Sequence, residues 1–349
     1  MLQDMPLFPY RIYCYNELAL RGYDLTVVSV SNKETQYDIE LKFKHVCLPF
    51  KKIGGFIWIK HFSQIHVKDY DHVVITPNLR VLNFYPYLLV KNKVQTSAWG
   101  HMKGCTSGNP IAARLRIPIF KRMRSLIFYD AGTRDSFAEK GFCMDKMFVA
   151  NNTQYVDPDT VNLNEERTYF LYVGRIQQRK GIDIALKAFA ELKHSVNDDK
   201  LRFIIVGAGD NKELMQIIVA EGISNSVSFK GAIHDQKQLG EIFAQAIAYV
   251  SPGHVGLGVL HSLACGVPVI TCSGRLHSVE ISNCKKDNSL VVPYTIADVT
   301  QAMYILYTDK KLLNKMSQAA VEYYKRYCTI DKMVDGIDDA LKYVESQNK

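Results

Sequence analysis

Short apolar runs alternate along this chain with longer segments in which apolar residues recur at helical spacing. Such runs, often rich in β-branched residues, predict strands, and the amphipathic segments between them predict helices. Strand and helix alternation is typical of parallel sheets built from βαβ units. In the first half, the pattern predicts strands at residues 25–30, 72–76, 94–97, 125–129 and 146–149, after a helix at 10–21.

The second half continues this alternation behind a polar segment at residues 151–166, which we interpret as a domain linker. A chain of 349 residues can bury two separate cores. We therefore predict two α/β domains, residues 1–158 and 159–349, each with a Rossmann-like, doubly wound sheet. In the second domain we expect strands at 170–173, 202–206, 227–230, 248–250 and 267–271, helices at 181–192, 211–221, 236–245 and 259–265, and helices again from residue 296 onward.

The start of the chain departs from this plan. A doubly wound domain opens with a strand whose carboxyl end meets the ligand crevice. Here the chain begins almost at the first helix. We expect the N-terminal domain to lack its first strand, and we favour a truncated start over a strand that is supplied in an unusual way.

The composition narrows the class of protein. The chain is 47% hydrophobic and has a net charge of +8, without a signal peptide or an apolar run of the ~20 residues that cross a bilayer. Eight cysteines without a C-x-x-C pair predict reduced thiols in a cytoplasmic protein. Nucleic-acid-binding motifs are absent. Basic and apolar residues alternate in one segment that resembles an interfacial membrane contact, although a solvated helix face is the alternative: Arg114, Leu115, Arg116, Ile117, Ile119, Phe120, Lys121, Arg122 and Arg124.

A basic loop follows the predicted strand at 170–173. Gly174 ends this strand, and Arg175 and Lys180 come before the next helix. Both cations therefore fall at the carboxyl edge of the sheet, where open α/β sheets bind ligands. Arginine offers a diphosphate a bidentate fork, and lysine offers it a point charge. An ordinary basic surface loop is the alternative.

A glycine-rich loop follows the predicted strand at 248–250. Gly253, Gly256 and Gly258 cluster between this strand and a helix, and glycine permits close backbone approach. Backbone amides at the helix start suit an anion or a hydroxyl group. His261 lies about one turn into the helix, so its side chain could lean back towards the loop. A tight turn with a packed core histidine is the alternative.

The two segments, V-G-R…K-G and the glycine-rich loop that leads into G-V-P-V-I, resemble the donor-binding half of family 4 (group 1) glycosyltransferases. The resemblance implies the GT-B fold, in which two Rossmann-like domains face a cleft. It implies that the segment of Gly174, Arg175 and Lys180 holds the donor diphosphate. It also implies that backbone amides of the second loop hold the donor sugar and phosphate, namely those of His254, Val255, Gly256 and Leu257.

One departure from the family pattern matters for the donor. The common pattern has two glutamates eight positions apart around the glycine-rich loop, and the second contacts the nucleotide ribose. Those positions read Gly253 and His261 here. A histidine can still hydrogen-bond ribose hydroxyls. This variant resembles a branch seen among bacterial polysaccharide-assembly transferases.

Weaker resemblances extend the predicted site. Gly207 and Gly209 follow a strand in a loop that borders the nucleotide in the family, and Ile233 lies in a strand-turn that flanks the base. Glu280 falls in the stretch that closes the donor pocket, and we expect its side chain to be exposed. His101 follows a strand end of the first domain and is our candidate for donor-sugar contact or proton handling, with a structural histidine as the alternative.

Together these features predict a glycosyltransferase that uses a UDP- or GDP-sugar and needs neither a cofactor nor a metal, and the family resemblance implies that the anomeric configuration is retained. The expected acceptor is a growing, lipid-linked glycan of cell-surface polysaccharide assembly, at the cytoplasmic face of an anionic membrane. Two alternatives remain open at this point. A nucleotide-sugar epimerase shares the two-domain layout but needs carboxylates in the cleft, and a non-catalytic protein that binds nucleotide sugars would tolerate the missing glutamate.

Overall fold

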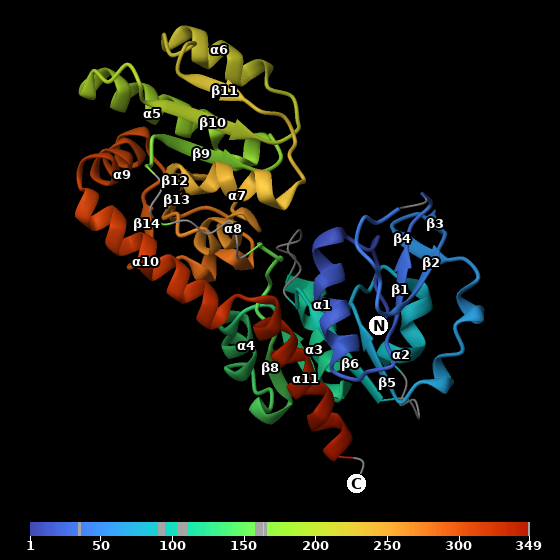
Figure 1. Cartoon of the computed structure of the whole chain (residues 1–349). Helices are drawn as coiled ribbons and strands as arrows, with labels where there is room; N and C mark the ends of the chain where they lie inside the picture. Colours follow the sequence, from blue (N-terminus) through green and yellow to red (C-terminus); the bar gives the residue numbers. More distant parts are fainter. Residues whose placement is uncertain (34–35, 90–94, 103–109, 158–162, 164–165, 348–349) are drawn as a thin grey trace. The chain divides into compact units, whose positions relative to one another are not determined.

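The computed structural model describes the chain except residues 34–35, 90–94, 103–109, 158–162, 164–165 and 348–349. It divides into two compact units, drawn in Figure 1. Unit 1 comprises Met1–Tyr155 together with Thr329–Lys349, and unit 2 comprises Val156–Cys328. The chain passes from unit 1 to unit 2 between Tyr155 and Val156, close to the predicted domain boundary between residues 158 and 159. The last helix, however, belongs to unit 1 and not to the second domain as we predicted.

Unit 2 is built on one parallel, six-stranded sheet in the order β11-β10-β9-β12-β13-β14. The chain lays down strands outward in one direction from β9 and then outward in the other direction from β12. This is the doubly wound order that we predicted, and it has its switch point between β9 and β12. The strands are β9 (Tyr169–Val173), β10 (Arg202–Val206), β11 (Val227–Phe229), β12 (Ala246–Val250), β13 (Val269–Cys272) and β14 (Ser289–Val292).

Helices cover both faces of this sheet, because right-handed crossovers on the two sides of a switch point leave on opposite faces. The central strand β12 is buried along its whole length, so it reads as a continuous apolar run rather than an alternating one. The α7 N-cap is Asp235, whose side chain accepts from the amide of Gln238. The helices are α5 (Ile182–Val196), α6 (Lys212–Ala220), α7 (Gln236–Ala244), α8 (Gly258–Ala264), α9 (Ile296–Thr308) and α10 (Lys310–Tyr327).

Unit 1 also contains a parallel sheet, and its first position is filled by the first residues of the chain. Leu2 bridges β1 on one side and β5 on the other, both in parallel. Its amide donates to Val74 O at 2.8 Å, and the amide of Gln3 donates to Val28 O at 2.9 Å. The expectation that this domain lacks its first strand is therefore wrong. A segment this short carries no periodicity, which is why the sequence pattern did not reveal it.

The resulting order in unit 1 is β2-β1, the segment around Leu2, and then β5-β6-β7-β8. The hairpin of β3 and β4 and the edge strand β2 were not predicted, because their residues are mostly exposed and mix apolar with charged side chains. The strands are β1 (Thr26–Val30), β2 (Lys44–Leu48), β3 (Phe50–Ile53), β4 (Phe56–Ile59), β5 (His72–Ile75), β6 (Gln95–Gly100), β7 (Leu126–Phe128) and β8 (Met147–Val149). The helices are α1 (Pro9–Leu20), α2 (Tyr85–Leu89), α3 (Pro110–Arg122), α4 (Ala131–Ala138) and α11 (Ile330–Ser346).

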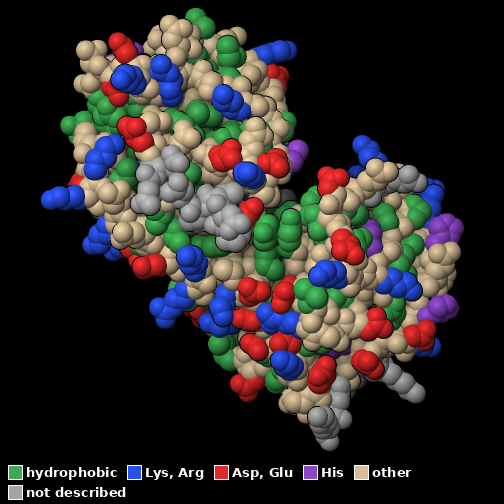
Figure 2. Space-filling model, in the orientation of Figure 1, with side chains coloured by type: hydrophobic (Ala, Val, Ile, Leu, Met, Phe, Trp, Pro, Cys, Tyr) green, Lys and Arg blue, Asp and Glu red, His purple; other side chains and the backbone are tan. Residues whose placement is uncertain are grey.

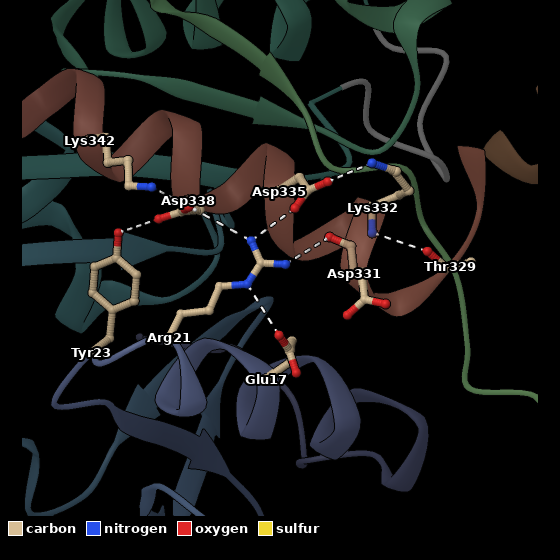
Figure 3. A network of polar contacts seen from close by, with 9 residues as sticks. All are labelled: Glu17, Arg21, Tyr23, Thr329, Asp331, Lys332, Asp335, Asp338 and Lys342. Atoms are coloured by element: carbon tan, nitrogen blue, oxygen red, sulfur yellow. Dashed lines mark hydrogen bonds and ion pairs between the residues drawn. The ribbon is translucent and has the colours of Figure 1, made fainter. Parts of the chain in front are cut away.

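The last helix, α11, returns to unit 1 and packs beside α1 and β8. A Cβ atom on Gly336 would lie 2.0 Å from Val149 O, so only glycine permits this approach. Figure 3 shows the polar network at the same contact. Arg21 at the end of α1 lies 2.9 Å from Asp335 and 3.7 Å from Asp338, and Tyr23 donates to Asp338 at 2.7 Å. Apolar residues of α11 and α1 share one buried cluster. This packing places α11 in unit 1, although α11 follows unit 2 in the sequence.

The surface carries charges of both signs, and the cysteines are not cross-linked among the described residues. Lysine and arginine side chains are interspersed with carboxylates on the face drawn in Figure 2. Among the described residues, no helix combines the length and the apolar character needed to cross a membrane. The seven cysteines that the structure describes are free thiols, and Cys105 lies outside the described residues. The predicted membrane segment lies on α3 and just beyond it, and the side chains of Arg114 and Leu115 are likewise outside the description.

Candidate functional site

The two loops singled out in the sequence meet at the switch point of unit 2. One follows β9 and the other follows β12, and these strands are neighbours in the sheet. Because the sheet is parallel, both loops leave from its carboxyl edge, where the reversal of strand order opens a crevice. The position alone makes this edge the candidate site of unit 2.

The loops are joined by their backbones. The amide of Gly253 donates to Lys180 O at 3.0 Å, and the amide of His254 donates to Arg179 O at 2.8 Å. A Cβ atom on Gly253 would lie 2.3 Å from Arg179 O, so a larger residue would force the loops apart. Gly181 has φ +67°, a conformation that favours glycine. The glycines thus let two chain segments pack at backbone contact.

The side chain of Lys180 extends across this junction. Its Nζ donates to His254 O at 2.7 Å. Burial, with the nearby charges of Arg179 and Arg175, lowers the pKa of Lys180 to about 8. Arg175 and Arg179 are exposed, and within the part of the chain that the structure describes none of the three cations forms an ion pair. The junction therefore carries a positive charge that an anionic ligand would balance.

Among the four amides predicted to hold the donor, those of His254 and Val255 have partners within the protein. The amide of His254 bonds to the first loop, and the amide of Val255 donates to His277 Nδ1 at 3.3 Å. His277 Nε2 lies 2.7 Å from Cys272 O. The imidazole must therefore carry its proton on Nε2 and accept on Nδ1, and burial lowers its pKa so that it stays neutral. His277 is a residue that the sequence analysis missed, because no motif singles it out.

The structure shows why the two positions after β10 are glycine. Gly207 and Gly209 have φ of +153° and +147°. A Cβ atom on Gly207 would lie 1.9 Å from Gly174 O, and one on Gly209 would lie 2.3 Å from Ile176 O. This loop therefore lies directly against the loop after β9. Ile233 is partly buried against the core of unit 2, and its predicted contact with the base stays a prediction.

His261 and Glu280 are both buried. His261 is 3% exposed and stacks on Phe243, with ring centroids 4.6 Å apart, and burial lowers its pKa to about 4. This is the environment of a packed core histidine, so a contact with ribose stays a prediction. Glu280 is 2% exposed, in the short 3-10 helix Val279–Asn283. The expectation that Glu280 is exposed is therefore wrong, because this turn folds back onto α8.

In unit 1, His101 follows β6 at the carboxyl edge of the sheet, as predicted. Its side chain is exposed and meets Tyr129 edge to face, with centroids 4.8 Å apart. The buried Arg11 lies against the same Tyr129 ring at 5.0 Å and donates to Asn152 Oδ1 at 2.6 Å. Arg11 was also missed, because it lies inside an amphipathic helix where its burial has no signature in the sequence.

Comparison with known proteins agrees with this geometry. Residues 156–323 match the family model described as "Glycosyl transferases group 1". The lipopolysaccharide glucosyltransferase WaaG of Escherichia coli (strain K12) is 27% identical over 127 residues, which are 35% of this chain and 33% of that protein. The D-inositol 3-phosphate glycosyltransferase of Arthrobacter sp. (strain FB24) is 30% identical over 159 residues, 44% of this chain and 37% of that protein. The chain thus aligns with little more than a third of these curated relatives.

Solved structures resemble the chain along nearly its whole length. HepE of Anabaena, in complex with UDP and glucose, has a TM-score of 0.69 at 12% identity and is matched over 98% of both chains. The sucrose-phosphate synthase of Thermosynechococcus elongatus has a TM-score of 0.71 at 16% identity over 99% of both chains. At such low identity these matches show the fold, which is the GT-B fold that we predicted.

Proposed function

We propose that this chain, whose residues 156–323 belong to the group 1 glycosyl transferases, transfers a sugar from a UDP- or GDP-linked donor to a glycan acceptor. The observation that carries the proposal is the excess of positive charge at the switch point of unit 2. Lys180, Arg175 and Arg179 follow β9, in a segment that packs at backbone contact against the loop after β12. Glu280 is the acidic group that acts on Lys180. A nucleoside diphosphate is a ligand that balances such a charge.

Lys180 is the centre of the proposed chemistry. Breaking the bond from the sugar C1 to the diphosphate oxygen builds negative charge on the leaving group. One ammonium proton of Lys180 bonds to His254 O, so two remain for phosphate oxygens. Gly256 leaves the space beside this ammonium open, since a Cβ atom there would lie 3.7 Å from Lys180 Nζ. With Arg175 reaching the same diphosphate, protein cations supply the charge that a metal supplies elsewhere, so we propose a metal-independent reaction.

The finer assignments follow from resemblance. We propose retention of the anomeric configuration, donor contacts from Gly207, Gly209 and Gly256, and a role for His101 beside the reacting sugar. Two relatives act, by their names, on lipopolysaccharide and on D-inositol 3-phosphate, which supports a hydroxyl acceptor. Ile119 and Phe120 are buried in the core of unit 1, so the exposed cations Lys121, Arg122 and Arg124 are what supports the proposed peripheral contact with anionic membrane. We propose a lipid-linked glycan at that membrane as the acceptor.

The donor assignment is tested by thermal melting and calorimetry with UDP, GDP, UDP-glucose and GDP-mannose. A donor that binds the folded state raises its melting temperature. We expect the wild type to bind either the uridine or the guanosine compounds, with an affinity that falls at least tenfold in Lys180→Ala. The control variant Lys212→Ala, which changes an exposed lysine on α6, should keep the wild-type affinity. Binding of a nucleotide sugar without transfer of its sugar to any acceptor would favour a non-catalytic protein. An unchanged nucleotide affinity in Lys180→Ala would refute the proposed contact between Lys180 and the diphosphate.

The membrane assignment has its own measurement. Co-sedimentation with phosphatidylglycerol vesicles should retain the chain at low salt and release it at high salt, because exposed charges are screened there. Phosphatidylcholine vesicles serve as the control. Equal recovery in the supernatant with both lipids would remove the membrane contact and leave the donor assignment untouched.

A further inference from the structure

A carboxylate lies at the switch point of the other sheet, in unit 1. The segment around Leu2 runs parallel to β1 and β5 and lies between them. From this segment the order proceeds to β1 and β2 on one side and to β5, β6, β7 and β8 on the other. Asp4 follows the segment directly, so it stands at the carboxyl edge where the order of strands reverses. In open α/β sheets this is where ligands bind.

The two oxygens of Asp4 have different surroundings. Asn78, just beyond β5, donates from Nδ2 to Asp4 Oδ2 at 2.6 Å. Asp4 Oδ1 is shielded from solvent and receives no hydrogen bond. No lysine, arginine or histidine of the described residues pairs with this carboxylate. Burial is the largest influence on Asp4 and raises its pKa, whereas hydrogen bonds from Asn78 and from the backbone of Asp4 itself oppose the rise.

An unsatisfied carboxylate oxygen in this setting costs free energy, which a ligand donor would recover. The only side-chain donor that the described residues supply to this carboxylate is Asn78, which bonds to Oδ2 and not to Oδ1. The side chain as a whole is only half-buried, so it is within reach of the surface. These features are typical of a binding residue and differ from those of a structural carboxylate with both oxygens bonded.

The same edge of the sheet leads from Asp4 to His101. Gly100, at the end of β6, has φ +141°, and a Cβ atom there would meet Pro77, Thr76 and Tyr129 at 3.8 to 3.9 Å. Thr76 and Pro77 directly precede Asn78, and Tyr129 contacts His101. The edge therefore offers a hydrogen-bond acceptor, Asp4 Oδ1, which suits a hydroxyl group.

We propose that Asp4 binds the acceptor, with Oδ1 accepting a hydrogen bond from a hydroxyl group of a sugar or related polyol, and that Asn78 is a positioning residue that orients the carboxylate. This inference rests on the proposed glycosyl transfer and names the site of its second substrate. It assigns to unit 1 a residue that no sequence motif marked. The charge on the carboxylate makes this hydrogen bond one of the stronger kind.

Asp4→Asn is a close test, because the amide oxygen can still accept from Asn78. The amide nitrogen then occupies the place of Oδ1 and donates where the carboxylate accepted. The full chain would be assayed with UDP-glucose and GDP-mannose as donors and with methyl α-D-glucopyranoside, methyl α-D-mannopyranoside and myo-inositol as acceptors. Hydrolysis of the donor by water would be followed in the same samples. Asp24→Asn, an exposed carboxylate just before β1 and so at the opposite edge, is the matched control.

We expect Asp4→Asn to raise the acceptor KM or lower kcat/KM for transfer by roughly ten- to a hundredfold, as for a lost hydrogen bond to a charged group. Donor hydrolysis and nucleotide affinity should stay within about twofold of the wild type, because those contacts lie in unit 2. Asn78→Ser should give a smaller loss of the same kind. Asp24→Asn should match the wild type in every measurement.

Unchanged transfer in Asp4→Asn, or an altered donor affinity with unchanged acceptor KM, would overturn the inference while leaving glycosyl transfer in place. Absence of both hydrolysis and transfer in the wild type would instead overturn the proposed function, and this inference with it. If Asp4→Asn melts well below the wild type, Asn78→Ser decides, since it leaves the carboxylate present and changes only its orientation. Full transfer by a folded Asn78→Ser would then overturn the positioning role, and with it the account of Asp4.

Discussion

The backbone contact between the two loops of unit 2 makes a sharp prediction for Gly253→Ala. The added Cβ atom would lie 2.3 Å from Arg179 O and 2.4 Å from the carbonyl carbon of Lys180, whereas ordinary contact begins at 3.4 Å. The loops must therefore separate by about 1.1 Å, the difference between 3.4 and 2.3 Å. Both partners are backbone, so no side chain can rotate to relieve the clash.

Such a shift breaks the bonds that join the loops. The bond from Gly253 N to Lys180 O would lengthen from 3.0 to about 4.1 Å, and the bond from His254 N to Arg179 O would lengthen from 2.8 to about 3.9 Å. Two lost hydrogen bonds at about 1 kcal/mol each, with residual strain, amount to roughly 2–4 kcal/mol. At about 2–4 °C per kcal/mol for a unit of this size, the melting temperature should fall by roughly 4–16 °C.

The assay is thermal melting combined with calorimetry of nucleotide binding. Because Lys180 Nζ is held by His254 O across the same junction, the shift should also weaken nucleotide affinity at least tenfold. Gly256→Ala is the control for stability, since its Cβ atom meets only Lys180 Nζ at the ordinary distance of 3.7 Å. Gly55→Ala, with open space around it in unit 1, is the control for both measurements. A Gly253→Ala protein with the melting temperature and affinity of the wild type would refute the reasoning.

Three further predictions follow from the charges. The pKa of Lys180 is about 8, so nucleotide affinity should fall about tenfold per pH unit above pH 8 as the ammonium is lost, and calorimetry of Lys180→Arg should show no such fall between pH 7 and 9. The pKa of His261 is lowered to about 4 from 6.5 in the unfolded chain, so its contribution to stability is complete above pH 6.5 and is lost as the pH falls towards 4. That loss is on the order of 3 kcal/mol. In urea unfolding, the free energy of unfolding of His261→Gln should therefore fall less than that of the wild type between pH 6.5 and pH 4. Arg21→Ala should destabilise the docking of α11 by about 1–2 kcal/mol, and hydrogen exchange should be faster in α11 with α9 unchanged; equal rates in α11 would contradict the role of the network in Figure 3.

Local pattern was sufficient for most regular elements of unit 2, although it did not predict β14. Strands β9, β10 and β12 are short and mostly buried apolar runs, and α5 buries one face, so both periods can be read from consecutive residues. The glycines of the two loops could also be recognised in the sequence, because close approach of two backbone segments requires glycine. Arg175 and Lys180 could be placed at the sheet edge for the same reason: a loop after a parallel strand always leaves from the carboxyl side.

Other features depended on contacts between residues far apart in the chain. The burial of Glu280, the bond between His277 and the amide of Val255, and the orphaned oxygen of Asp4 are set by neighbours that no local window contains. The return of α11 to unit 1 depends on the apolar cluster that it shares with α1 and on the close fit of Gly336 against Val149.

The sequence by itself thus determined the α/β class, the order of most elements, and the loops that carry the basic chemistry. Only the tertiary structure decided which unit the last helix joins, that the first residues act as a strand, and which polar atoms remain unsatisfied. The physical reason is that periodicity and glycine usage are local properties of the chain. Pairing of strands, burial and hydrogen-bond satisfaction are properties of distant segments brought together, so they are fixed only when the core forms.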